Sequence, residues 1–252
     1  MTNIILCGCN GKMGRAVTAC AADRDDCTIV AGIDLNTEAT AGYPVFSALT
    51  DCTVAADVIV DFSHPSCLEG ILAFAADRGI PAVICTTGLS QEQIQAIHKA
   101  AVAVPLFFSA NMSLGVSLLA ELAKKAASIL GTSFDVEIIE RHHNQKLDAP
   151  SGTALMLADA VREGLPYQPE YVFDRHVVRQ KRDPHEIGFS AVRGGTIVGE
   201  HEILFAGHDE CLSLSHRAQS KEVFAAGAVN AAVFLTKQPA GLYAMKDLVA
   251  QA

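Results

Sequence analysis

Apolar runs alternate with amphipathic stretches through the first half of the chain. The runs at 3–8, 28–34, 56–62 and 80–86 predict strands, and helical periodicity predicts helices to about Asp23, over 67–79 and from Ser90. Ser90 and Gln93 match the S-x-x-Q capping box at the start of the last of these helices. Continuous runs such as DVIVDF are typical of strands buried on both faces, so the pattern predicts an α/β fold with a doubly wound parallel sheet.

The pattern changes after a long amphipathic helix predicted over 114–131, which ends at Gly131. The predicted elements that follow are a strand at 135–140, a helix from Ser151 and strands at 186–192, 195–207 and 211–218, then a helix at 221–237 and a short tail at 241–250. This order predicts a second, α+β domain with a mostly antiparallel sheet. Gly194 and Gly195 predict a hairpin turn within that sheet.

Composition and charge narrow the class of protein. The 252 residues are half apolar and carry a net charge of −9, which suits one or two globular domains and gives no general attraction to nucleic acid or anionic lipid. With no membrane span and no secretory leader in view, we expect a cytoplasmic protein. The eight cysteines lack zinc spacing, which predicts reduced thiols and no metal site. The most charged stretch, 175–186, predicts a solvated loop, with a flap over a ligand as the second interpretation.

A glycine-rich turn follows the first predicted strand and opens the first helix. Gly8, Gly11 and Gly14 allow backbone amides and the helix N-terminus to face a pyrophosphate, although a tight strand-to-helix connection is the plainer interpretation of such a turn. Asp34 ends the second strand twenty residues beyond Gly14, where a carboxylate accepts from a ribose hydroxyl. Its charge and the neutral Leu35 favour NADH, while Lys12 and Arg15 in the turn leave use of both NADH and NADPH open.

A cluster of positive charge lies between the strand at 135–140 and the next helix. His142, His143 and Lys146 precede a turn of Ser151, Gly152 and Thr153, which together predict two anion-binding points for a small dicarboxylate. Adjacent histidines on an extended backbone point in opposite directions, which disfavours a shared metal and suits one proton donor and one carboxylate ligand. Two surface histidines are the plainer alternative, and Asp148 is interpreted as a structural residue. A nicotinamide and a proton donor together imply reduction of a C=C or C=N bond.

Eight motifs occur in order along nearly the whole chain: GCNGKMGR, VDFSHP, CTTGLS, SANMSLGV, ERHHNQKLDAPSGTAL, IGFSAVRGGTIVGEHEILFAG, HRAQSKEVFAAGA and GLYAMKDL. Together they resemble the 4-hydroxy-tetrahydrodipicolinate reductase family, also called dihydrodipicolinate reductase, and the H-H-x-x-K-x-D-A-P-S-G-T segment is highly specific. The resemblance implies an NADH- or NADPH-dependent oxidoreductase that makes tetrahydrodipicolinate on the route to diaminopimelate and lysine.

The resemblance also implies roles for individual residues. His142 is the general acid and Lys146 is important for catalysis. The residues that hold the substrate carboxylates are His143, Lys146, Gly152 and Thr153, and Thr87 also reaches the substrate. The residues at the cofactor phosphates are Gly8, Gly11, Lys12, Met13 and Gly14, with Asp34 at the adenosine ribose. The residues on the nicotinamide side are Phe62, Ser63, Thr86, Thr87, Gly88, Asn111 and Met112.

The implied architecture is a Rossmann-type dinucleotide-binding domain over 1–112, an inserted substrate-binding and tetramerisation domain over 113–221, and a segment at 222–252 that returns to the first domain. The resemblance also implies that the open-faced sheet of the inserted domain forms a homotetramer. The chain departs from the family pattern at four positions, where Leu35, His64, Cys85 and Met112 stand in place of residues common in the family, and a side chain at Cys85 would crowd the cofactor. The rival hypotheses are a non-catalytic dinucleotide sensor and a reductase or dehydrogenase of another amino dicarboxylate, such as aspartate dehydrogenase.

Overall fold

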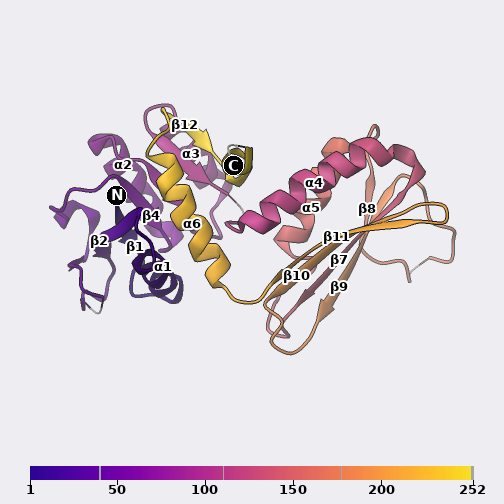
Figure 1. Ribbon diagram of the computed structural model, residues 1–252, viewed down its shortest axis with the longest axis horizontal. Helices are drawn as coiled ribbons and strands as arrows, with labels where there is room; N and C mark the ends of the chain where they lie inside the picture. Colours follow the sequence, from indigo (N-terminus) through magenta and orange to yellow (C-terminus); the bar gives the residue numbers. More distant parts are fainter. Residues whose placement is uncertain (40, 110, 177, 251–252) are drawn as a thin grey trace. The chain divides into compact units, whose positions relative to one another are not determined.

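The computed structural model describes residues 1–39, 41–109, 111–176 and 178–250, and it divides the chain into two compact units (Figure 1). Unit 1 comprises Met1–Leu114 together with Lys221–Ala252, and unit 2 comprises Gly115–Ser220. The chain therefore leaves the first unit, completes the second, and returns to the first.

Unit 1 is built on a seven-stranded sheet in which every neighbouring pair of strands is parallel. Its strands are β1 (Thr2–Cys7), β2 (Cys27–Ile33), β3 (Val45–Phe46), β4 (Val58–Asp61), β5 (Ala82–Ile84), β6 (Pro105–Phe108) and β12 (Gly241–Tyr243). The order β12-β6-β5-β4-β1-β2-β3 reverses direction at β1, which lies between β2 and β4. The predicted α/β fold with a doubly wound parallel sheet is confirmed.

Helices cover both faces of this sheet. Its helices are α1 (Lys12–Ala22), α2 (Leu68–Arg78), α3 (Gln91–Ala100), α6 (Glu222–Leu235) and α7 (Met245–Ala250), with short 3₁₀ turns at Leu49–Asp51 and Pro65–Cys67. Successive residues of β1 point to opposite faces, so Ile4 packs with α1 and α6 while Ile5 packs with α2 and α3. The Ser90–Gln93 capping box is present at the start of α3, as predicted. None of the helices in the described part of the chain combines the length and apolar character needed to cross a membrane.

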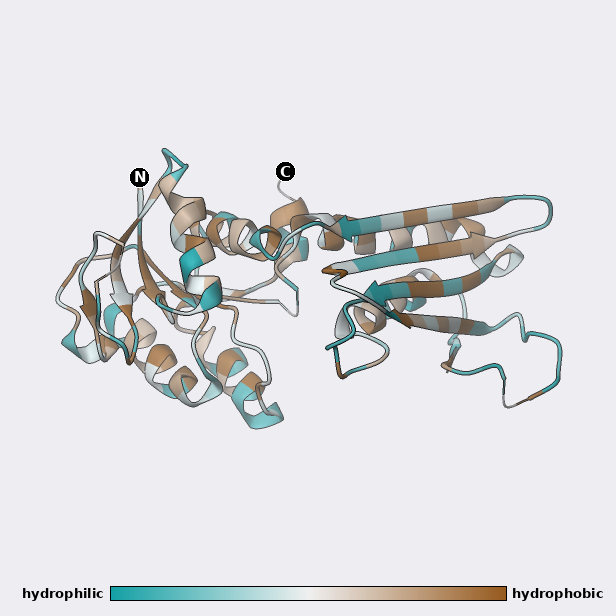
Figure 2. Ribbon diagram, turned by 90° about the horizontal axis from the view of Figure 1, so that it is seen from below, coloured by the Kyte–Doolittle hydropathy of each residue, from teal (hydrophilic) through white to brown (hydrophobic). Residues whose placement is uncertain are grey.

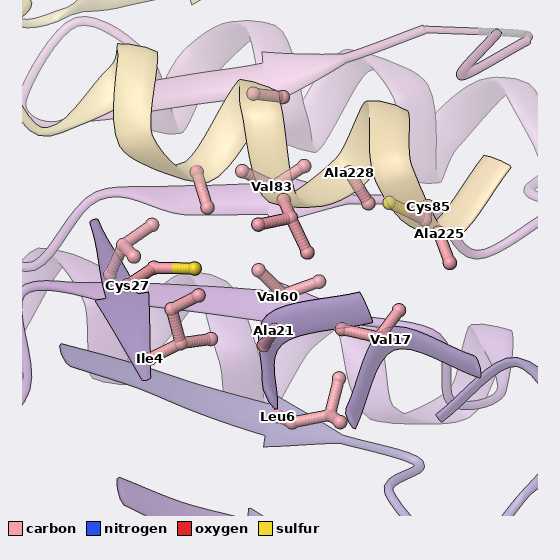
Figure 3. Close-up of a cluster of buried hydrophobic side chains, with 14 of the residues drawn as sticks. Ile4, Leu6, Val17, Ala21, Cys27, Val60, Val83, Cys85, Ala225 and Ala228 are labelled. Atoms are coloured by element: carbon pink, nitrogen blue, oxygen red, sulfur yellow. The ribbon is translucent and has the colours of Figure 1, made fainter. Parts of the chain in front are cut away.

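The helix α6 completes the core of unit 1 from the far end of the sequence (Figure 3). It contributes small side chains, among them Ala225 and Ala228, that let it lie close to the sheet. Figure 3 shows Cys85 beside these two alanines, so its side chain fills the core. Burial raises the pKa of the Cys85 thiol well above its usual range, which keeps it a neutral, apolar group.

Unit 2 is a five-stranded sheet with two helices on one face (Figure 1). Its elements are α4 (Leu114–Leu130), a 3₁₀ turn at Gly131–Ser133, β7 (Asp135–His142), α5 (Gly152–Gly164), β8 (Glu170–Val172), β9 (Glu186–Arg193), β10 (Gly199–Ala206) and β11 (Cys211–Ala218). Buried and half-buried positions alternate along β7 and β10, which appears in Figure 2 as alternating colours along the strands. The buried positions pack against α4 and α5.

The prediction of a mostly antiparallel second sheet was wrong. The order is β11-β10-β7-β9-β8, in which β10 is antiparallel to both of its neighbours while β9 is parallel to β7 and to β8. The predicted hairpin at Gly194 and Gly195 was also wrong, because β7 lies between β9 and β10. The turn pairs with the end of β7 instead, where Gly194 N–H donates to the His142 carbonyl at 2.9 Å.

The charged stretch 175–186 is a connection between β8 and β9, apart from Val177, which lies outside the described residues, and Glu186, which begins β9. Two of its three arginines bond to β7 rather than extending into water. Arg182 donates to Asp135 at 2.9 Å and to Glu137 at 3.2 Å, and Arg175 also donates to Glu137 at 2.8 Å. These bonds fasten the connection to the first half of β7.

A glycine in α6 is required by the close approach of this helix to the backbone. A Cβ at Gly227 would lie 1.6 Å from the carbonyl oxygen of Met112, whereas a Cβ at Gly70 in α2 would meet no described atom within 4 Å. We therefore expect Gly227→Ala to lower the free energy of unfolding by about 3 kcal/mol or more, because the helix must move away from the core. The matched change Gly70→Ala should raise it by about 0.5–1 kcal/mol, since alanine is the better helix former. Urea unfolding followed by circular dichroism measures both, and equal effects would contradict this account.

Candidate functional site

A pocket of about 430 Å³ lies at the carboxyl ends of the parallel strands of unit 1. It is lined by the ends of three neighbouring strands, with Gly8 after β1, Asp34 after β2, and Phe62 and Ser63 after β4. The carboxyl edge of a parallel sheet, at the strand where the winding reverses, is where α/β proteins bind their ligands. Five residues predicted to contact the cofactor, Gly8, Gly11, Asp34, Phe62 and Ser63, line this pocket.

The glycine turn in this pocket is tight because its backbone segments touch. Gly8 has φ of 74°, and a Cβ there would lie 2.5 Å from the carbonyl oxygen of Phe62. A Cβ at Gly14 would lie 2.2 Å from the carbonyl oxygen of Gly8. Gly11 is the N-cap of α1 and can supply no side-chain cap, so the N-terminus of the helix is open to an anion. These residues fit a dinucleotide pyrophosphate.

Asp34 links the glycine turn to the end of β2. Its carboxylate accepts from Asn10 N–H at 3.0 Å and from Asn36 N–H at 3.1 Å. Leu35 also lines the pocket, and its side chain is 96 % exposed. Lys12 is exposed, and Met13 is half-buried against the core. The edge of the pocket at Asp34 thus has a carboxylate and an exposed leucine side by side.

Asp61, which sequence reasoning missed, joins two of the predicted cofactor segments. The side chain is fully buried at the end of β4 and accepts from Ser63 N–H at 2.9 Å and from the Thr86 hydroxyl at 2.7 Å. Burial raises its pKa, and the bonds from Ser63 and Thr86 oppose that rise. Thr87 and Gly88 follow on the exposed loop, where Gly88 has φ of 77°.

The two remaining predicted cofactor residues follow β6. The Asn111 side chain accepts from Ser113 N–H at 2.8 Å, which shapes the turn into α4. The Met112 side chain is buried in the core of unit 1 at 5 % exposure. Met112 does not line the pocket of unit 1, and its carbonyl oxygen packs against α6 at Gly227.

The second cluster lies in unit 2, at the carboxyl end of β7 and the start of α5. His142 is the last residue of β7 and is 8 % exposed, while His143, the residue after the strand, is half-buried. Glu140, two residues before His142, points to the same buried face and is 1 % exposed. The His142 Nδ1 atom lies 2.6 Å from Glu140 Oε2.

Glu140 accepts four hydrogen bonds. Besides the contact with His142, its oxygens accept from both terminal nitrogens of Arg193 at 2.7 Å and from Ser151 N–H at 3.1 Å. Burial by itself would raise the pKa of Glu140, but the bonds and positive charge of Arg193 and His142 outweigh it and lower the pKa. Glu140 is therefore an ionised carboxylate inside unit 2.

His201, on β10, is the second buried histidine of this cluster. Its ring lies edge-on to that of His142 with centroids 5.1 Å apart, and its Nε2 is 3.0 Å from the Ser151 hydroxyl. Burial, and then the positive charge of His142, lowers the pKa of His201 to about 4. The two neighbouring imidazoles thus differ in environment, because His142 contacts a carboxylate and His201 a hydroxyl.

Ser151 and Lys146 are already engaged within the protein. The Ser151 hydroxyl caps α5 by accepting from Ala154 N–H at 3.1 Å, so it already has a partner within the protein. Lys146 Nζ pairs with Asp148 Oδ1 at 2.7 Å, which lowers the pKa of that carboxyl. Arg193 also donates to the Asp148 carbonyl at 2.6 Å and holds this loop. Gly152, the first residue of α5, is exposed, and a Cβ there would meet no described atom within 4 Å.

Sequence reasoning found the two histidines and Lys146 but missed Glu140, Arg193 and His201. The alternation of β7 carried a signal for Glu140, because residues two apart on a strand share a face. Arg193 and His201 come from other strands, and no local pattern marks them. Within the described residues, no group of three or more histidine, cysteine, aspartate or glutamate side chains is placed to hold a metal ion.

The architecture of unit 1 is that of the pyridine-nucleotide-dependent oxidoreductases, and comparison with known proteins agrees with this class. Family models described as dihydrodipicolinate reductase, N-terminus, and dihydrodipicolinate reductase, C-terminus, match residues 2–112 and 115–249. The 4-hydroxy-tetrahydrodipicolinate reductase of Caldanaerobacter subterraneus subsp. tengcongensis is 50 % identical over 99 % of this chain and 98 % of its own length. The enzyme of the same name from Clostridium tetani is 45 % identical over 97 % of this chain and 96 % of its own length.

A solved structure agrees in fold along nearly the whole chain. The dipicolinate-bound dihydrodipicolinate reductase of Paenisporosarcina sp. TG-14 superimposes with a TM-score of 0.82 at 26 % identity, covering 98 % of this chain and 99 % of that one. The chain belongs to the dihydrodipicolinate reductase family. It is an oxidoreductase that depends on a pyridine nucleotide and has the reductase activity that names the family.

The lowered pKa of His201 predicts a pH dependence of stability. The imidazole titrates near 4 when folded and near 6.5 when unfolded, so between these values only the unfolded state binds the proton. The free energy of unfolding should therefore fall as the pH drops from 7 to 4, by roughly 3 kcal/mol from this group.

The variant His201→Gln has no titrating group at position 201. Its free energy of unfolding should therefore fall by roughly 3 kcal/mol less than that of the natural chain over the same pH range. The matched control is His208→Gln, in which the replaced side chain is 95 % exposed. It should leave the pH dependence unchanged. Urea unfolding at pH 7 and pH 4 measures all three proteins, and identical slopes for the natural chain and His201→Gln would refute the assignment.

Proposed function

We propose that the chain reduces 4-hydroxy-tetrahydrodipicolinate, or its dehydrated form dihydrodipicolinate, to tetrahydrodipicolinate for diaminopimelate and lysine biosynthesis, with His142 as the proton donor. The observation that carries this proposal is the position of His142 at the carboxyl end of β7, bound through Nδ1 to Glu140 and close to Lys146 in the chain. Lys146 assists by placing positive charge beside the reacting ring.

The substrate is a small cyclic dicarboxylate, which suits the two anion-binding points of unit 2. Support comes from the related reductase whose structure contains dipicolinate, itself an aromatic dicarboxylate. His143 and Lys146 are proposed to bind one carboxylate. The backbone of Gly152 and Thr153 at the start of α5 binds the other, and Ser151 contributes by capping that helix. Thr87 of unit 1 is proposed to reach the substrate as well.

The cofactor is proposed to occupy the pocket of unit 1. Gly8, Gly11 and Gly14, with Lys12 and Met13, hold its phosphates, and Asp34 accepts from the adenosine ribose. The nicotinamide side is held by Phe62, Ser63, Thr86, Thr87, Gly88, Asn111 and Met112. When bound, the reduced nicotinamide supplies a hydride. NADH is favoured because Asp34 and Leu35 offer no cation to a 2′-phosphate, while Lys12 leaves NADPH usable.

A homotetramer is proposed to form through the open face of the unit 2 sheet. In the described residues both helices of this unit pack on the other face. The open face carries ion pairs between strands, including Arg141 with Glu200 at 3.7 Å and Arg217 with Glu200 at 2.9 Å. The cytoplasmic location expected from the sequence stays a prediction.

The reaction is tested with substrate made from pyruvate and aspartate semialdehyde by the preceding synthase, while the loss of reduced-cofactor absorbance is followed. We expect oxidation of NADH and, more slowly, of NADPH, in both cases dependent on the synthase. His142→Gln should lower kcat by about 10²- to 10⁴-fold with NADH binding unchanged, because it removes the proton donor. His208→Gln is the matched control and should retain full activity. A folded His142→Gln protein with full turnover would refute the role of His142.

Cofactor preference is tested at Leu35. A guanidinium beside Asp34 would pair with the 2′-phosphate of NADPH, so Leu35→Arg should lower KM for NADPH about 10-fold relative to KM for NADH. Val102→Arg adds the same charge at a side chain that is 83 % exposed and does not line the pocket. This control should leave the ratio unchanged, and a similar shift in both variants would contradict a local effect at Asp34.

A further inference from the structure

We propose that Glu140, held in place by Arg193, is a positioning residue that keeps the proton of His142 on Nδ1 and so makes Nε2 the atom that protonates the substrate. This inference rests on the proposed function, because it adds the partner of a proton donor that the proposal already names. Neither Glu140 nor Arg193 needs to touch the substrate for this role.

The protonation of Nδ1 follows from the chemistry of its partner. An ionised carboxylate can only accept hydrogen bonds, and the His142 Nδ1 atom lies 2.6 Å from Glu140 Oε2. A short contact between these atoms therefore requires a hydrogen on Nδ1. The other nitrogen, Nε2, is then the atom at which the ring gains and loses its exchangeable proton.

The proton transfer balances within this arrangement. The imidazolium gives the proton on Nε2 to the substrate carbon that does not receive the hydride, and the N–H bond electrons stay on the ring. The ring becomes a neutral imidazole that still donates from Nδ1 to Glu140. The Glu140 charge remains paired with Arg193 throughout, so no buried charge is left alone after the transfer.

Arg193 fixes the carboxylate from the neighbouring strand. Because β7 and β9 are parallel and His142 is in register with Arg193, both residues end their strands at the same edge. The guanidinium donates to both oxygens of Glu140 at 2.7 Å, a two-point contact that sets the plane of the carboxylate. Ser151 N–H adds the remaining bond, which ties the carboxylate to the start of α5.

The space around Nε2 is also restricted. A Cβ at Gly199 would lie 3.1 Å from His142 Nε2, so the backbone of β10 passes close to this atom. The ring of His201 lies beside that of His142 in a T-shaped contact. With Nδ1 held by Glu140 and the ring flanked by β10, His142 has one preferred orientation.

Replacement of Glu140 by glutamine should disturb this arrangement in a defined way. The carboxylate accepts four bonds on two oxygens, and an amide has only one oxygen, so at least two of the donors would face an NH₂ group. In Glu140→Gln, an amide with its NH₂ group at the Oε2 position faces His142 Nδ1 and one Arg193 nitrogen with a donor, and an amide with its NH₂ group at the Oε1 position faces the other Arg193 nitrogen and Ser151 N–H. The two-point contact with Arg193 is lost in either orientation. We expect kcat to fall about 10²-fold or more, while KM for the dicarboxylate changes less than about 3-fold.

The matched control is Glu137→Gln. Glu137 lies on the same strand and accepts from Arg175 and Arg182, but the hydrogen bonds found for it in the described residues come from no histidine. The change removes the same charge from a comparable carboxylate–arginine cluster. It should leave kcat within about 2-fold of the natural enzyme, which separates positioning of His142 from a general loss of charge on β7.

A second measurement reads the position of the proton directly and does not require that Glu140→Gln folds. Solid-state ¹⁵N NMR of histidine-labelled full chain, with the His142 signals assigned by their absence in His142→Gln, should show neutral His142 protonated on Nδ1. Glu140→Gln should shift the population toward protonated Nε2. Neutral His142 protonated on Nε2 in the natural protein would overturn the proposal, whether or not Glu140→Gln folds.

The outcomes separate this inference from the proposed function. If His142→Gln abolishes turnover and a folded Glu140→Gln keeps full kcat, the positioning role is wrong and the proton donor stands. If His142→Gln itself keeps full turnover, the proposed function of His142 fails first. We expect kcat to fall in Glu140→Gln and the proton of neutral His142 to move from Nδ1. We expect kcat to stay normal in Glu137→Gln.

Discussion

Parallel pairing of strands determines where the functional groups of both units lie. Parallel strands bring their carboxyl ends to one edge, and in unit 1 this places the glycine turn, Asp34 and the Phe62–Ser63 segment around one pocket. Unit 2 uses the same constraint on a smaller scale. The pairing of β7 with β9 sets His142 opposite Arg193, and Glu140 lies within reach of both. An antiparallel β9 would have carried Arg193 to the far end of the sheet.

The parts of the fold that depend on local signals could be predicted from the sequence. Burial on both faces of β4, the capping box at Ser90 and the change of pattern after Gly131 could all be predicted, because periodicity and capping involve neighbouring residues. The order of strands in the second sheet could not be read in this way. Gly194 and Gly195 have the chemistry of a hairpin turn, yet β7 is inserted between the strands that they connect, and only long-range packing decides that.

The residues of the candidate site likewise fall into those that a local sequence pattern marks and those that long-range strand pairing brings together. His142, His143 and Lys146 share one short segment with Gly152 and Thr153, so their charge pattern was visible in the sequence. Arg193 and His201 reach the cluster through strand pairing, and Asp61 joins Ser63 to Thr86 from the end of β4. A buried carboxylate has to be paired, so Glu140 and Asp61 each organise the groups around them. The predicted site residues were thus easier to find in the sequence than the groups that hold them.

The late return of the chain to unit 1 has a consequence for how the protein is made. The core on the α1 face of the first sheet includes Ala225, Val229, Leu235 and Met245, which leave the ribosome only after the whole of unit 2. Until then the nascent first sheet exposes an apolar face. Such a surface binds chaperones or causes aggregation. Unit 2 is contiguous in sequence and can finish folding before its predecessor. Truncation within α6 would therefore destabilise unit 1 more than unit 2.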